Sequence, residues 1–222
     1  MPDLIQRANR KTLALSIMKD GRVIVKAPHR MSDKLISKFI QDKQGWLKSK
    51  LDIIKKTNAE FEDCINYRSL LLYGEKYQIC VGNVKRVMRD DVRKIIVAPN
   101  ASKTSDVINK IKTWYKKLAK EILTERTKHI ADAIKIQPGQ IRLTNAKGKW
   151  GSCNLKKSIS LNWRMIMLTP ELIDYVIIHE LCHVKELNHS SMFWKTVEMF
   201  LPNYQALRKN LKKYSFTLEL YR

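Results

Sequence analysis

The chain has 222 residues and a formal net charge of +22, from 43 Lys and Arg against 21 Asp and Glu. Apolar residues make up 44% of it, with only 7 Gly and 6 Pro, which excludes collagen-like, mucin-like and wholly disordered proteins. No apolar run approaches the roughly 18 residues of a membrane span, and the N-terminus lacks the apolar stretch of a secretory signal. We therefore expect a globular protein with one large domain or two small ones.

The N-terminal residues predict a β-hairpin followed by a helix. Residues 12–18 and 22–26 alternate apolar and polar side chains, and Lys19-Asp20-Gly21 between them is a turn sequence. Ser32 is a candidate N-cap for a helix that runs to about Lys56. Gly45 lies inside that helical pattern and weakens it.

Short apolar runs and one long helix are expected next. The runs 69–73, 77–81 and 94–98 are typical of strands. Residues 104–134 predict a long amphipathic helix. Its expected buried stripe comprises Val107, Ile108, Ile111, Trp114, Tyr115, Leu118, Ile122 and Leu123.

The C-terminal part predicts a strand, a loop, a second strand and then helices. The strand–loop–strand segment covers 140–163, and Pro170 stands at the favoured first position of a helix that we expect to run to Leu187. Two further helical segments are expected around 190–200 and 203–213. The predicted class is α+β, with an N-terminal β-rich section over residues 1–100 and a second domain over 101–222.

The sequence His179-Glu180-Leu181-Cys182-His183 carries the clearest chemical signal. Histidines four residues apart lie on one face of a helix, so both imidazoles can reach one metal ion. The adjacent carboxylate of Glu180 can then accept a proton from a metal-activated water, which is the H-E-x-x-H arrangement of zinc hydrolases. The motif alone also occurs by chance, where the histidines are packing residues.

A catalytic zinc ion usually has a third protein ligand, and His189 is the first candidate. Its spacing from His183 equals that of a known extended zinc motif in which Gly stands where this chain has Glu186. Because His189 would lie on another face of a continuous helix, the helix must end before it, and Asn188 is suited to ending it. Glu186 is the rival third ligand.

Residues near the motif are candidates for substrate binding. Ser158–Asn162 alternates as expected for a sheet edge that could pair with a peptide, although it is equally consistent with a core strand. Trp150, Asn162 and Arg164 are candidates to line the cleft, and Arg164 and Tyr204 are candidate donors to the oxyanion. The alternative for Arg164 is a structural ion pair, for example with Asp174.

Several segments together resemble the YgjP-like metallopeptidase family, which is related to SprT-like proteins. They are WGSC at 150–153, ISLNWRMIM at 159–167, IDYVIIHELCHVKELNHSSMFW at 173–194 and LPNY at 201–204, with looser matches at 10–17, 23–28 and 72–79. The resemblance implies a zincin-like catalytic domain with an active-site helix on a small sheet. It also implies His179, His183 and His189 as zinc ligands and Glu180 as the catalytic acid and base.

The leading hypothesis is therefore a zinc metallopeptidase acting on a peptide or protein substrate. One alternative is a metal-dependent hydrolase of nucleotide phosphoanhydrides, because the excess positive charge attracts anions. Another is a nucleic-acid-associated protein with a structural zinc, with Trp46, Tyr67, Tyr73 and Trp114 available for stacking. The four scattered cysteines do not form a disulfide pattern, which favours a cytoplasmic protein with reduced thiols.

Overall fold

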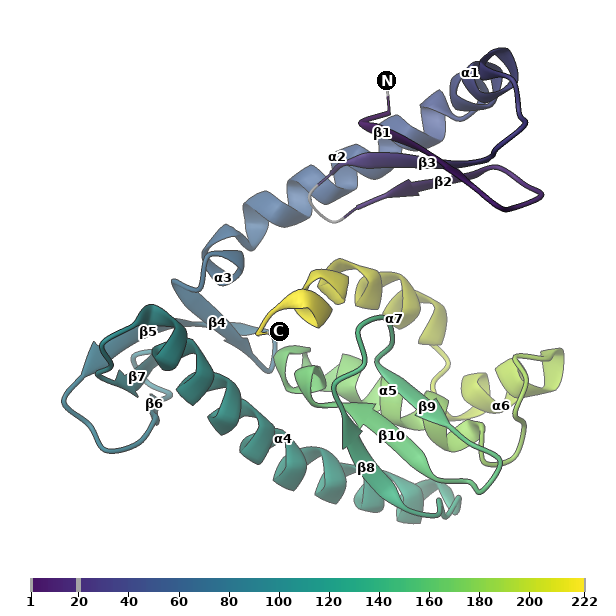
Figure 1. The fold of residues 1–222 in the computed structure, drawn as a ribbon. Helices are drawn as coiled ribbons and strands as arrows, with labels where there is room; N and C mark the ends of the chain where they lie inside the picture. Colours follow the sequence, from purple (N-terminus) through teal and green to yellow (C-terminus); the bar gives the residue numbers. More distant parts are fainter. Residues whose placement is uncertain (1, 19–20, 222) are drawn as a thin grey trace. The chain divides into compact units, whose positions relative to one another are not determined.

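The computed structural model describes residues 2–18 and 21–221, which divide into two compact units over residues 1–62 and 63–222 (Figure 1). Both units contain helices and small sheets, so the predicted α+β class is confirmed. The expected start of the catalytic domain near residue 101 stays a prediction. Among the described residues, none of the helices combines the length and the apolar character needed to cross a membrane.

The first unit contains a three-stranded sheet and two helices. Its strands are β1 (Leu4–Ala8), β2 (Ala14–Ile17) and β3 (Val23–Pro28). The central strand β3 is parallel to β1 and antiparallel to β2, which confirms both predicted hairpin strands. The predicted turn residues Lys19 and Asp20 lie outside the described residues. A small core forms around Val25, Ala27 and Ile36.

The single helix predicted after Ser32 is two helices, α1 (Asp33–Asp42) and α2 (Gln44–Glu60). Ser32 caps the first as predicted, because its hydroxyl oxygen accepts a hydrogen bond from the backbone N–H of Leu35. At Lys43 the backbone leaves the helical conformation, with φ −99° and ψ 4°. The break lies two residues before Gly45, the residue that weakens the helical pattern.

The second unit begins with a short helix and a four-stranded sheet. The elements are α3 (Glu62–Ile65), β4 (Ser69–Leu72), β5 (Glu75–Gly82), β6 (Met88–Asp90) and β7 (Ile95–Pro99). The strand order is β4-β5-β7-β6, and the three predicted strands are confirmed as β4, β5 and β7. The sequence did not predict β1 or β6, because β6 has three residues and β1 shows no apolar alternation.

The long helix α4 spans Thr104–Ile134, as predicted. It ends where Lys135 adopts the left-handed conformation, with φ 56° and ψ 40°. Its buried residues are Val107, Ile111, Tyr115, Ala119, Leu123, Thr127, Ile130 and Ala131. Trp114, predicted in the buried stripe, is only half-buried and lies beside a surface pocket instead.

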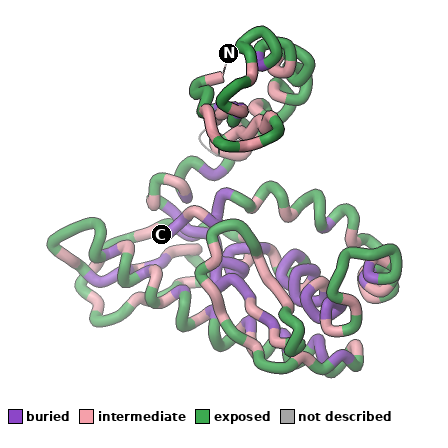
Figure 2. Tube along the Cα trace, turned by 45° about the vertical axis from the view of Figure 1, so that its right-hand side comes forward, coloured by how far each residue is buried: buried purple, intermediate pink, exposed green. Residues whose placement is uncertain are grey.

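A second small sheet and three helices complete the unit. They are β8 (Ile141–Thr144), β9 (Gly151–Cys153), β10 (Ile159–Asn162), α5 (Pro170–Cys182), α6 (Ser191–Phe200) and α7 (Tyr204–Leu211). A 3-10 helix over Trp163–Met167 joins β10 to α5, and another covers Lys212–Glu219. Burial is concentrated in α5, β10 and the first of these 3-10 helices (Figure 2). The rings of Tyr115, Trp163 and Tyr221 meet in this core.

Candidate metal centre

The central helix α5 carries His179, and the residue that caps its C-terminal end is His183. It starts after Thr169 with Pro170 at its first position, and nine of its 13 residues are buried. The helix was predicted to reach Leu187 but ends at Cys182. The N–H groups of Val184 and Lys185 bond to carbonyls three residues back, which closes tight turns directly after the helix. This early end lets the chain return toward α5 before residue 189.

The structure brings His179, His183 and His189 together. Their candidate ligand atoms all lie within 4.8 Å of one another, and the Nε2 atoms of His179 and His189 are 3.0 Å apart. Among the described residues this group consists of histidines alone, and Glu186, the rival third ligand, is not in it. Burial, together with the charges of His183, His189 and Arg208, lowers the pKa of His179 to about 3.

Glu186 contributes to this cluster through its backbone. Its carbonyl oxygen lies 2.9 Å from Nδ1 of His183, and His183 is itself buried. When the imidazole is neutral, a proton on Nδ1 donated to this carbonyl leaves Nε2 unprotonated and free to bind a metal ion. The role of residue 186 in the cluster is therefore to orient His183.

Aromatic rings from α6 support the three histidines. Phe193 is fully buried, stacks on His183 at 4.3 Å and meets His179 and His189 edge to face. Trp194 stacks on both His189 and Tyr204. Ser190 starts α6 by accepting a hydrogen bond from the N–H of Phe193. The sequence analysis missed these two rings, although a serine cap directly before them marks the start of their helix.

Tyr204, a predicted oxyanion donor, thus belongs to the ring stack beside His189, and its hydroxyl role stays a prediction. A basic residue that acts on the histidines is Arg208, which the sequence analysis did not single out. Its guanidinium lies 4.8 Å from the centroid of the Trp194 ring, and its charge lowers the pKa of His179 and His189. Arg208 follows Tyr204 by one helical turn, a spacing that the sequence could have shown.

Glu180 lies against the edge of the second small sheet. It is 5% exposed, and its Oε2 is buried without a hydrogen-bond partner among the described residues. Burial raises the pKa of Glu180 to about 7, and the charge of Lys149 opposes that rise. A Cβ atom at Gly151 would lie only 2.6 Å from Cγ and Oε1 of Glu180. Gly151 is therefore the residue that lets strand β9 approach this carboxylate.

The sheet order corrects one prediction. Ser158–Asn162 was considered as an edge strand for peptide pairing, but β10 is the central strand, parallel to β8 and antiparallel to β9. Both of its sides are already hydrogen-bonded. Of the three strands, the edge next to Glu180 is β9, which contains Gly151.

Asn162 is a buried structural residue in this arrangement. Its side-chain amide donates to the carbonyls of Ala146 and Lys149, and its Oδ1 accepts from the N–H of Arg164. These bonds hold the loop that leads into β9. Trp150, at the end of that loop, is partly exposed and its carbonyl accepts from the N–H of Asn162. Substrate contact by Trp150 stays a prediction.

Arg164 is also placed inside the protein. It is 1% exposed, and its guanidinium donates to the carbonyls of Leu220 and Tyr221 and to Oδ1 of Asn145. The carboxylate of Asp174, the suggested ion-pair partner, binds Arg126. The bonds of Arg164 tie the C-terminal residues to the core, and substrate contact by Arg164 stays a prediction.

Replacing Arg164 by Ala is expected to lower the free energy of unfolding by on the order of 3 kcal/mol, because several buried acceptors lose a charged donor. The KM of the folded fraction for a protein substrate such as casein should stay unchanged. Arg142→Ala is the control, since Arg142 is exposed and bonds only to the Gln140 side chain among the described contacts. Urea denaturation and steady-state kinetics measure both. A rise in KM with unchanged stability would restore the substrate-binding role.

The cluster fits a divalent metal ion on its own chemistry. Three neutral imidazoles form the donor set of many zinc sites, and the low pKa of His179 keeps its ring unprotonated. The orphaned Oε2 of Glu180 needs a polar partner, which a water molecule at the metal would supply.

Comparisons with known proteins agree with a metal centre. The sequence matches the family described as "YgjP-like, metallopeptidase domain" over residues 11–214. Solved structures that it resembles are the metallopeptidase zymogens abylysin of Pyrococcus abyssi, at 26% identity, and jannalysin of Methanocaldococcus jannaschii, at 22%. They cover 40% and 41% of this chain and 90% and 94% of their own, each with a TM-score of 0.37, too low to carry a structural conclusion. No curated protein matches the sequence significantly.

Proposed function

The chain belongs to the YgjP-like metallopeptidase family, and from this membership we propose that it is a zinc-dependent peptidase. The observation that carries the proposal is the convergence of three histidines beside a buried, unpaired carboxylate. In this proposal His179, His183 and His189 hold the zinc ion and Glu180 is the general base. Bound zinc would supply Lewis-acid polarisation and lower the pKa of a water molecule.

Glu180 moves the proton in this mechanism. Its carboxylate accepts a proton from the attacking water and delivers it to the leaving amine as the peptide bond breaks. A pKa of about 7 suits both steps, because the group can accept and release a proton near neutral pH. Arg208 and Tyr204, on one helix beside the ring stack, are candidates to stabilise negative charge on the carbonyl oxygen.

The edge strand β9 is the proposed place for the substrate backbone. Within the described residues β9 is hydrogen-bonded to β10 on one side only. A peptide that extends the sheet from the other side would satisfy the backbone groups of β9 and bring its carbonyl toward Glu180. The close approach allowed by Gly151 supports this placement.

The metal content of the purified protein tests the proposal. We expect one zinc ion per chain in the wild type. His189→Ala should weaken zinc binding by more than the roughly 10–100-fold that loss of an outer-shell partner costs. His129→Ala, which removes an exposed histidine of α4, is the control and should keep its zinc. Elemental analysis and competition with a chelator measure both quantities.

Two outcomes would contradict the proposal. The first is that protein never exposed to a chelator contains no zinc and takes none up. The histidine cluster would then be a packing feature and not a metal site. Zinc-loaded protein that releases phosphate from nucleoside triphosphates but does not cleave casein would assign the site to phosphoanhydride hydrolysis. In the proposed enzyme casein is cleaved and triphosphates are not.

A further inference from the structure

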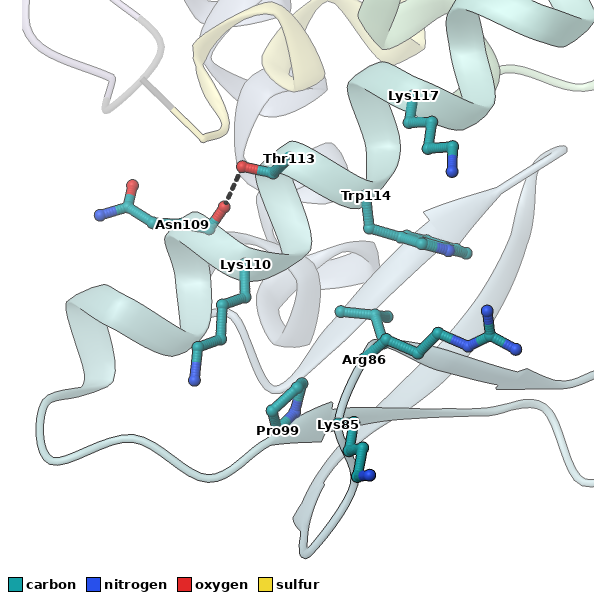
Figure 3. Close-up of a pocket in the computed structure, with 9 residues that line it drawn as sticks. Lys85, Arg86, Pro99, Asn109, Lys110, Thr113, Trp114 and Lys117 are labelled. Atoms are coloured by element: carbon teal, nitrogen blue, oxygen red, sulfur yellow. Dashed lines mark hydrogen bonds between the residues drawn. The ribbon is translucent and has the colours of Figure 1, made fainter.

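A pocket outside the metal centre lies between α4 and the segment that joins β5 to β6 (Figure 3). It has a volume of about 510 Å³ and shares no residue with the histidine cluster. Four of its lining residues are basic, Lys85, Arg86, Lys110 and Lys117, and none is acidic. The pocket therefore favours a negatively charged ligand. The proposed peptidase mechanism does not use this pocket.

The pocket also presents an aromatic ring among these cations. Trp114 extends from α4 and is half-buried, and its ring centroid lies 5.3 Å from that of Tyr115. In Figure 3 the side chains of Arg86 and Lys117 lie on either side of the Trp114 indole. Lys110 is anchored nearby, because its ammonium group donates to the carbonyl of Asn100 at 2.9 Å. A ligand with both a flat ring and negative charge fits this combination.

The basic surface continues along α4 beyond this pocket. A neighbouring cavity of about 420 Å³ shares Arg86, Trp114 and Lys117 with it and adds the basic Arg89 and the acidic Glu121. Lys110, Trp114, Lys117 and Lys128 are spaced so that they fall on one face of the helix, over roughly 27 Å at about 1.5 Å per residue. This length exceeds what one mononucleotide would occupy. Glu121 and Glu125 reduce the charge of the distal half, so the binding residues are expected near Trp114.

We propose that this groove binds single-stranded nucleic acid, with a base stacked on Trp114 and phosphates held by Arg86 and Lys117. An acidic peptide would pair with the cations but would leave the indole unused. An intact duplex offers no free base face for stacking. A free nucleotide would fill only the first pocket, whereas a strand stacked on Trp114 would also reach the neighbouring cavity that contains Arg89. The site is independent of the metal, so it can be tested without peptidase activity.

Binding of a labelled twelve-residue oligothymidylate to the full chain, measured by fluorescence anisotropy at several salt concentrations, tests the proposal. Arg86→Ala with Lys117→Ala is expected to weaken binding at least tenfold. It should also flatten the slope of log K against log salt by about 1.4, for two lost phosphate contacts on a single strand. Trp114→Leu is expected to weaken binding roughly tenfold with no change in that slope.

The matched control is Lys112→Ala with Lys116→Ala, which removes the same charge from another side of α4, away from the pocket lining. The control should bind as the wild type does. Equal losses in both double variants would mean unspecific attraction and would overturn the proposal, as would undetectable binding by the wild type. If UTP displaces the labelled oligomer as effectively as unlabelled oligomer does, the ligand is a free nucleotide and the proposal is overturned. If poly-glutamate does so, the ligand is an acidic peptide and the proposal is likewise overturned. If thermal melting shows that Trp114→Leu is unfolded, the two charge variants decide the question.

Discussion

Replacing Glu180 by Gln is expected to lower kcat/KM for casein cleavage by about 10²–10⁴-fold while zinc content stays at the wild-type level. The amide keeps the size of the side chain in its buried position but cannot accept the proton. The orphaned Oε2 is the atom whose function is lost. Kinetics on metal-loaded protein, together with elemental analysis of the same sample, measure both quantities.

Glu186→Gln is the matched control for this variant. It makes the same chemical change six residues later, where the backbone carbonyl and not the carboxylate contacts His183. We expect both its activity and its zinc content to match the wild type. If Glu186→Gln loses its zinc, the result would show that the carboxylate of Glu186 is a zinc ligand. Full activity in Glu180→Gln would remove Glu180 from the mechanism.

Replacing Gly151 by Ala is expected to cost about 10²-fold in kcat/KM without loss of zinc. The added Cβ would lie within 2.6 Å of the Glu180 side chain, so the carboxylate must move away from its position. A displacement of about 1 Å in a catalytic group can reduce the rate by this factor. Kinetics with the same substrate and a thermal melt separate lost activity from lost stability.

Gly148→Ala is the control for Gly151→Ala. Gly148 lies three residues earlier in the same loop region, and a Cβ there would meet nothing within 4 Å. This variant should be as active and as stable as the wild type. Wild-type activity of Gly151→Ala would show that the approach of β9 to Glu180 is not required for catalysis.

Local sequence patterns predicted the elements whose residues repeat regularly. The helix over 104–134 has a long apolar stripe, and α5 has a proline at its first position, so both starts were predicted correctly. The i and i+4 spacing of His179 and His183 likewise follows from helix geometry. These features depend on neighbours within a few residues.

The features that the sequence did not predict depend on distant residues. The interior position of Arg164 depends on carbonyls 56 and 57 residues further along the chain. The central place of β10 depends on pairing with β8, which precedes it by a loop and a strand. The end of α5 at Cys182 depends on turns that the helical pattern of the following residues does not reveal. Pairing partners of this kind cannot be read from local periodicity.

The burial of the last residues affects when the second unit can fold during synthesis. Tyr221 packs against Tyr67 and Tyr115, and its backbone N–H lies 3.4 Å from the hydroxyl of Tyr67, 154 residues earlier. A nascent chain cannot make these contacts until residue 221 has left the ribosome. The first unit is complete in sequence long before that point. The aromatic contacts that join Tyr67, Tyr115 and Tyr221 are therefore formed later than the contacts within the first unit.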